Sequence, residues 1–174
     1  MLILITGGSK CGKSSLAERI LEKYSSSKYY IATMIPFCAE AHEAIERHRL
    51  IRRNKNFITI EKYTNIHEIK LSPNSNVLIE CIGNLCANEM FEKHENVPAD
   101  KIMQGIFSLK ENCNMLVVVT NQVGEDGISY SDGTMRYIEN MGKINQKIAE
   151  AADCVVEAVF GIPVVLKGEL PICR

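Results

Sequence analysis

The chain has 174 residues, of which 46% are hydrophobic and 24% are charged, with a formal net charge of −1. This length suits a single domain over residues 1–174, and the charge gives no reason to expect nucleic acid or an anionic membrane as a partner. No apolar run approaches the length of a membrane span, and no signal-peptide pattern opens the chain, so we expect a cytoplasmic protein. The seven cysteines form no Cys-x-x-Cys pair, which argues against a disulfide framework or a zinc site.

The first predicted element is a strand over Leu2–Thr6, and a helical pattern follows over residues 14–24. Between them lies a complete G-x-x-x-x-G-K-S phosphate loop, formed by Gly7, Gly8, Ser9, Lys10, Cys11, Gly12, Lys13 and Ser14. Backbone N–H groups of such a loop converge on phosphate oxygens, while Lys13 reaches the β- and γ-phosphates and Ser14 ligates Mg²⁺. A chance glycine turn is the alternative, but the flanking strand and helix favour a nucleoside triphosphate site.

Strand and helix patterns alternate along the rest of the chain. The expected strands are 29–32, Phe57–Glu61, 77–82, 115–120, 155–159 and 164–167, and the expected helices are 39–53, 66–70 (weak), 85–93, 99–112 and 136–152. Runs such as Met115–Val119 are apolar on both faces, which predicts an α/β fold with a mainly parallel sheet and helices on both faces. Phe57–Glu61 is less uniformly apolar and is expected near an edge. Ligands of such sheets bind beyond the carboxyl ends of the strands.

Residues 46–53 form the densest cationic segment of the chain. Arg49 and Arg52 together suit the forked recognition of a triphosphate. Neighbouring positive charge favours a neutral imidazole at His48, and a neutral imidazole is a nucleophile that could attack phosphorus. Spacing alone nevertheless favours a solvated basic helix face with an incidental histidine.

Glu80 ends an apolar strand pattern, where phosphate-loop proteins place the acidic residue that positions Mg²⁺ or its water. A carboxylate at the end of a buried strand is costly unless it is used or paired. We therefore expect Ser14 and Glu80 to hold Mg²⁺, with a helix-capping or salt-bridged role for Glu80 as the alternative.

Taken in order, these features resemble the bifunctional adenosylcobinamide kinase/adenosylcobinamide-phosphate guanylyltransferase family of cobalamin biosynthesis. The matching residues are 6–14, 30–33, Glu40, His48, Arg49, Arg52, Phe57, Thr59, Glu61, Glu80, Cys81, Asn88, 120–124, Gly127, Ile128, Gly142, Asn145, Gln146, Ala149, 151–153 and 161–167. Departures include Ala44 where the family usually has arginine, and Gln122 where it has glutamate.

The resemblance implies a phosphate-loop NTPase fold related to recombinase-type ATPases, assembly as a homotrimer, and a corrinoid substrate, adenosylcobinamide. It makes His48 the nucleophile that becomes guanylylated, with Lys13 as the second catalytic residue. GTP contacts are implied on the phosphate loop and on Ala32, Thr33, Met34, Arg49, Leu50, Ile51, Arg52, Glu61 and Glu80. The expected reactions are phosphorylation of adenosylcobinamide with GTP or ATP and transfer of GMP from GTP. A plain small-molecule kinase and a nucleotide-binding regulatory module are the alternatives.

Overall fold

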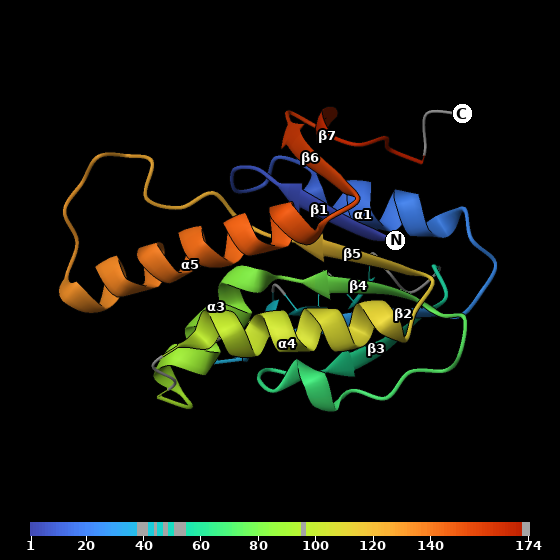
Figure 1. Ribbon diagram of the computed structural model, residues 1–174, viewed down its shortest axis with the longest axis horizontal. Coiled ribbons are helices and arrows are strands. Elements are labelled where there is room, and N and C mark those ends of the chain that lie inside the picture. The colour runs from blue at the N-terminus through green and yellow to red at the C-terminus, as the bar shows by residue number, and fades with distance from the viewer. Residues whose placement is uncertain (38–41, 44, 47–48, 51–54, 95–96, 172–174) are drawn as a thin grey trace.

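The computed structural model describes residues 1–37, 42–43, 45–46, 49–50, 55–94 and 97–171. These residues contain seven strands, which form one sheet. The strands are β1 (Leu2–Thr6), β2 (Lys28–Ala32), β3 (Phe57–Glu61), β4 (Asn76–Glu80), β5 (Met115–Val119), β6 (Cys154–Val159) and β7 (Ile162–Lys167). Their order is β3-β2-β4-β5-β1-β6-β7 (Figure 1). All neighbours are parallel except β6 and β7, which form an antiparallel hairpin. The expected mainly parallel sheet, with β3 at an edge, is confirmed.

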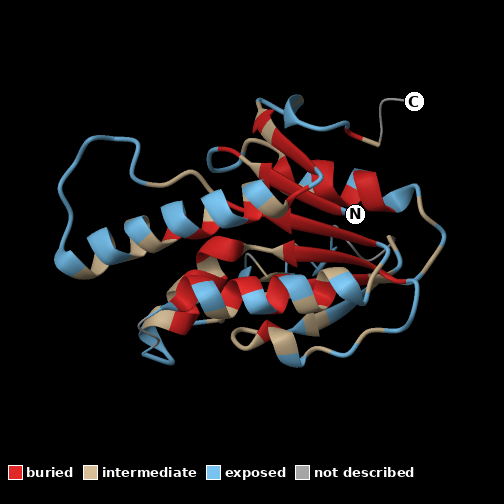
Figure 2. Cartoon of the chain, viewed as in Figure 1, coloured by how far each residue is buried: buried red, intermediate tan, exposed pale blue. Residues whose placement is uncertain are grey.

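Helices cover both faces of this sheet. The helices with assigned bounds are α1 (Lys13–Glu22), α3 (Ile82–Phe91), α4 (Pro98–Glu111) and α5 (Asp132–Ala151), with a 3-10 turn over Ile66–Glu68. Alternate residues of β1 point to opposite faces, so Ile3 and Ile5 pack with α1 while Leu2 and Leu4 pack with the layer of α3, α4 and α5. Burial on both sides explains why the central strands are almost wholly apolar (Figure 2).

The helix expected over 39–53 is only partly described. Residues 42–43, 45–46 and 49–50 are helical, and the remaining positions lie outside the described residues. None of the helices in the described part of the chain is long and apolar enough to cross a membrane.

Some of the expected boundaries were wrong. The strand expected over 77–82 ends at Glu80, and α3 begins at Ile82 rather than at residue 85. Helix α5 begins at Asp132, well before residue 136, and Figure 2 shows its first half largely exposed. Exposed helical turns show no periodic spacing of apolar residues, so the apolar pattern did not reveal them. Ser131 followed by Asp132 is nevertheless a typical helix start.

The sheet register sets the level at which the strand ends meet. Ala32 pairs with Glu61 on one side and with Glu80 on the other, so these residues form one row across three adjacent strands. Neighbouring strands lie about 4.8 Å apart, which puts the Cα atoms of Glu61 and Glu80 roughly 10 Å apart. Polar residues from distant parts of the sequence thus meet at one edge of the sheet.

Candidate active site

The phosphate loop, residues 7–14, leaves the carboxyl end of β1 and leads directly into α1. Gly7 has φ 138° and Gly12 has φ 97°, backbone conformations that residues other than glycine rarely adopt. A Cβ atom on Gly7 would lie 2.7 Å from the carbonyl oxygen of Ala158 in β6. Glycine is therefore required at position 7 by both the backbone conformation and the packing of the loop against β6.

The turn between β6 and β7 supports the phosphate loop from outside. The Gly161 N–H group donates a hydrogen bond of 2.9 Å to the carbonyl oxygen of Cys11. A Cβ on Gly12 would come within 3.2 Å of the Gly161 Cα. Nothing in the local sequence pattern predicted that the turn between β6 and β7 would contact the phosphate loop.

Lys13 is folded into the loop and is only 7% exposed. Its ammonium group donates to the carbonyl oxygen of Gly7 at 3.0 Å and also to that of Gly8. The same ammonium group is the one expected to meet the β- and γ-phosphates. A cavity of about 220 Å³ opens beside it, lined by Lys10, Cys11, Gly12, Lys13, Ser14, Ser15 and Glu18.

The Ser14 hydroxyl donates a hydrogen bond to Oε1 of Glu80, so the two residues predicted to hold Mg²⁺ are in direct contact. The other carboxylate oxygen accepts a hydrogen bond of 3.1 Å from the Tyr30 hydroxyl. Hydroxyl and carboxylate oxygens are the hard donors that Mg²⁺ prefers, so this pair fits that ion. Tyr30 belongs to the residues that match the family, and no sequence pattern predicted its bond to Glu80.

A second group of residues surrounds a cavity of about 260 Å³, which we call the base-side cavity. Its lining residues are Ala32, Met34, Pro36, His42, Ile45, Glu46, Arg49, Glu61 and Tyr63. Arg49 donates to Glu46 at 2.6 Å and also to Oε1 of Glu61, and both contacts raise its pKa, that with Glu46 the more strongly. The Tyr63 hydroxyl donates to Oε2 of Glu61 at 3.1 Å. Burial, and then this bond, raises the pKa of Tyr63. Glu61 is therefore partnered on both oxygens.

A smaller cavity of about 90 Å³ lies between these two groups and shares residues with the base-side cavity and with the Ser14–Glu80 contact. Its lining residues are Tyr30, Ala32, Met34, Ile45, Glu80, Cys81 and Asn84. A lysine, a hydroxyl and a carboxylate at the phosphate loop are thus followed, along the strand ends, by two further cavities.

Comparison with known proteins agrees with this arrangement. The profile of the family described as "Cobinamide kinase / cobinamide phosphate guanyltransferase" matches residues 3–166. The chain belongs to this family. It is 31% identical to the bifunctional adenosylcobalamin biosynthesis protein CobU of Escherichia coli (strain K12), over 96% of the chain and 100% of that protein. It is 32% identical to the CobU protein of Salmonella typhimurium over the same shares, and 28% identical to the CobP protein of Pseudomonas aeruginosa over 95% and 97%.

The family prediction is thereby confirmed, and with it the α/β phosphate-loop fold class. Not every residue that the family resemblance singled out faces the site. Thr33 is fully buried, and its hydroxyl donates to the carbonyl oxygen of Cys81 at 2.8 Å. Leu50 is 66% exposed, while His48, Ile51 and Arg52 lie outside the described residues. The roles of these residues remain predictions.

Two buried or half-buried amides hold the site together, and their contacts were not anticipated. Asn88, only 4% exposed, donates to the carbonyl oxygens of Thr33 at 2.8 Å and Tyr63 at 2.9 Å. It therefore joins the end of β2 to the turn after β3. Gln122, the family departure, donates to Glu157 at 3.0 Å beside the phosphate loop.

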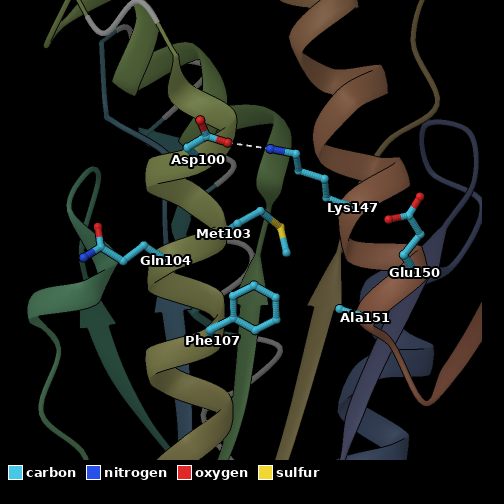
Figure 3. Close-up of a pocket in the computed structure, with 7 residues that line it drawn as sticks. All are labelled: Asp100, Met103, Gln104, Phe107, Lys147, Glu150 and Ala151. Carbon is cyan, nitrogen blue, oxygen red and sulfur yellow. Dashed lines mark hydrogen bonds and ion pairs between the residues drawn. The ribbon is translucent and has the colours of Figure 1, made fainter.

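A larger cavity lies elsewhere in the described part of the chain. It measures about 570 Å³ and lies between α4 and α5, where Asp100 and Lys147 form an ion pair across it (Figure 3). Met103 and Phe107 supply much of its apolar wall. No residue predicted for nucleotide or metal binding is among those that line this groove.

Proposed function

We propose that this chain carries out both reactions named by its family: phosphorylation of adenosylcobinamide with GTP or ATP, and transfer of GMP from GTP to the product. The observation that supports this most directly is the contact of Ser14 with Glu80. It lies beside Lys13, and the base-side cavity follows it along the strand ends. Together these groups match the parts that a bound nucleoside triphosphate needs.

In the first reaction, the hydroxyl of the aminopropanol arm attacks the γ-phosphorus, and the bond from that phosphorus to the bridging oxygen breaks, releasing GDP or ADP. Lys13 exchanges its loop carbonyl partners for phosphate oxygens and offsets the charge of the transition state. Ser14 and Glu80 would hold Mg²⁺, which neutralises phosphate charge when bound.

In the second reaction, a ring nitrogen of His48 attacks the α-phosphorus of GTP and pyrophosphate leaves. A phosphate oxygen of adenosylcobinamide phosphate then attacks the phosphorus, the P–N bond breaks with its electron pair going to the ring nitrogen, and neutral imidazole is released. Dividing one displacement into two is the usual logic of covalent catalysis. Arg49, next to His48 in the sequence, lines the base-side cavity, which supports this assignment.

We further propose that the phosphate loop, Ala32, Thr33, Met34, Glu61 and Glu80, with Arg49 through Arg52, bind the nucleotide. Residues 1–174 would act as one domain, and its nucleotide substrates suit a cytoplasmic location. A homotrimer is proposed from the family resemblance. Exposed apolar side chains at the β6–β7 turn and along β7, namely Phe160, Ile162, Val164, Val165 and Leu166, support association of copies at this edge.

The decisive experiment labels the protein with GTP carrying the label at its α-phosphate. Acid-labile, alkali-stable label on the wild type and on His42→Asn, but not on His48→Asn, is expected. His42 is the matched control because it is a histidine of the same predicted helix and lines the base-side cavity. Transfer of γ-label to adenosylcobinamide without any protein label would favour a plain kinase. Nucleotide binding without either transfer would favour a regulatory module.

A further inference from the structure

Glu61 is already occupied in this structure by a group that resembles guanine. The Arg49 guanidinium donates to Oε1 of Glu61, and the Tyr63 hydroxyl donates to Oε2. The base-side cavity lies directly beside these three residues. The carboxylate thus faces the cavity with a partner that is itself part of the cavity wall.

The donor edge of guanine consists of an N1–H and an N2–H₂ group on one carbon, which is a guanidine unit. Such an edge meets a carboxylate as an arginine does, through two parallel N–H donors. Adenine instead presents one donor beside one acceptor, and the acceptor would face a carboxylate oxygen. A carboxylate at this position therefore discriminates between the two bases by its hydrogen-bonding pattern.

We propose that Arg49 occupies Glu61 as a stand-in for guanine, and that a guanine base displaces it and frees its guanidinium for the triphosphate. This inference rests on the proposed function, because it takes Glu61 to be a base contact. It makes the Arg49–Glu61 pair a specificity-determining element for the transfer of GMP.

The exposure of the pair suits such an exchange. The side chains of Arg49 and Glu61 are 47% and 43% exposed, so their ion pair contributes little stability and is readily broken. Glu46 holds Arg49 through the other guanidinium nitrogen, at 2.6 Å, so only the nitrogen that contacts Glu61 is released for the triphosphate. Tyr63 remains bonded to the second oxygen and positions the carboxylate for the base.

The spacing of the sheet lets the same nucleotide reach both places. Glu61 and Glu80 stand two strands apart in one row, with Ala32 between them. The separation of roughly 10 Å across two strand spacings lets a base at Glu61 lie together with phosphates at Ser14. Phosphate binding at Lys13 needs no particular base, whereas release of Arg49 needs guanine. The first reaction would then accept either nucleotide, and the second would require GTP.

The test uses guanosine, which has the base but no phosphates, and measures its dissociation constant by protein-observed NMR titration. Arg49→Gln should bind guanosine about fivefold more tightly than the wild type, the order expected when an exposed ion pair no longer has to be broken. Arg49→Lys should fall between them, because an ammonium group keeps the charge but lacks the two guanidinium nitrogens that hold Glu46 and Glu61 at once. Labelling by α-labelled GTP should fall about a hundredfold in Arg49→Gln, since a phosphate ligand is lost.

Lys62→Gln is the matched control, because it removes the same charge next to Glu61 in the sequence but from an ion pair with Glu68. It should leave guanosine affinity unchanged. Unchanged or weaker guanosine binding in Arg49→Gln, or unaffected labelling, overturns the proposal.

Glu61→Gln tests the base contact separately from the displacement of Arg49. It should weaken guanosine binding and leave adenosine binding as it was. Equal guanosine affinity in Glu61→Gln and the wild type overturns the base contact and this inference with it. Label on His48 in the wild type tests the proposed transfer reaction independently of that result.

Discussion

Ser14 and Glu80 lie 66 positions apart in the sequence, yet the Ser14 hydroxyl donates a hydrogen bond directly to the Glu80 carboxylate. The contact joins the first turn of α1 to the carboxyl end of β4, with β5 lying between β4 and β1 in the sheet. It brings the two expected Mg²⁺ ligands together at the phosphate loop.

Replacing Glu80 by glutamine should keep the hydrogen bond from Ser14 but remove the charge that attracts a divalent ion. We expect kcat for both transfers to fall about a hundredfold, with a much higher Mg²⁺ requirement. Tyr30→Phe removes the other bond to Glu80 without changing a metal ligand and should cost less than about tenfold. Titration of both activities with Mg²⁺ measures this, and an ordinary Mg²⁺ dependence in Glu80→Gln would contradict the metal role.

Gly7→Ala should damage the phosphate loop through strain and collision together. The backbone φ of 138° disfavours alanine, and its Cβ would meet the Ala158 carbonyl at 2.7 Å. We expect a loss of about 2 kcal/mol in unfolding free energy and no measurable GTP binding. Gly142→Ala in α5 meets nothing within 4 Å and should instead stabilise the protein by about 0.5–1 kcal/mol. Urea denaturation of the two variants measures the contrast, and equal stability would argue against strain at Gly7.

Asn88→Ala should loosen the two segments that line the base-side cavity. It leaves the carbonyl oxygens of Thr33 and Tyr63 without their donor, at a cost of about 2–3 kcal/mol for buried groups. The KM for GTP should rise with little change in kcat. Asn112→Ala, which removes an exposed amide bonded to Ser108, should cost less than about 0.5 kcal/mol. Thermal melting and steady-state kinetics test this, and an unshifted Tm in Asn88→Ala would refute it.

Asp153 should make stability depend on acid pH. Its carboxylate accepts a hydrogen bond of 2.6 Å from the Leu2 N–H, which lowers its pKa more than any other contact does. A lowered pKa in the folded state adds stability that is fully present above the unfolded value of about 3.9 and is lost as the pH falls through the folded value. Asp153→Asn should therefore be less stable at pH 7, by about 0.5–1 kcal/mol because the group is exposed, and the difference should shrink below about pH 4.

Urea denaturation at several pH values provides the measurement for Asp153. Glu125→Gln, in the exposed loop after β5, should give a curve parallel to that of the wild type. A constant difference between Asp153→Asn and the wild type from pH 7 to pH 3 would show that the carboxylate charge is not involved.

Strand identity was readable in this chain because strands buried on both faces are apolar throughout, as β5 is. The start of α5 was not readable, since its first turns project from the core and carry no apolar period. Contacts such as Tyr63 with Glu61, or Gly161 with Cys11, depend on exact loop conformations and leave no local signal.

The sequence by itself determined the phosphate loop and the family, because the loop is a contiguous motif whose glycines set its conformation. Only the tertiary structure decided how the rest of the site meets that loop. Glu61, Ala32 and Glu80 share one row because β3, β2 and β4 pair in register. No local sequence pattern predicts the order of strands in a sheet. Pairing over long sequence distances is settled by burial of the whole sheet, and that burial places Glu61 and Glu80 in one row at the edge of the sheet where the phosphate loop lies.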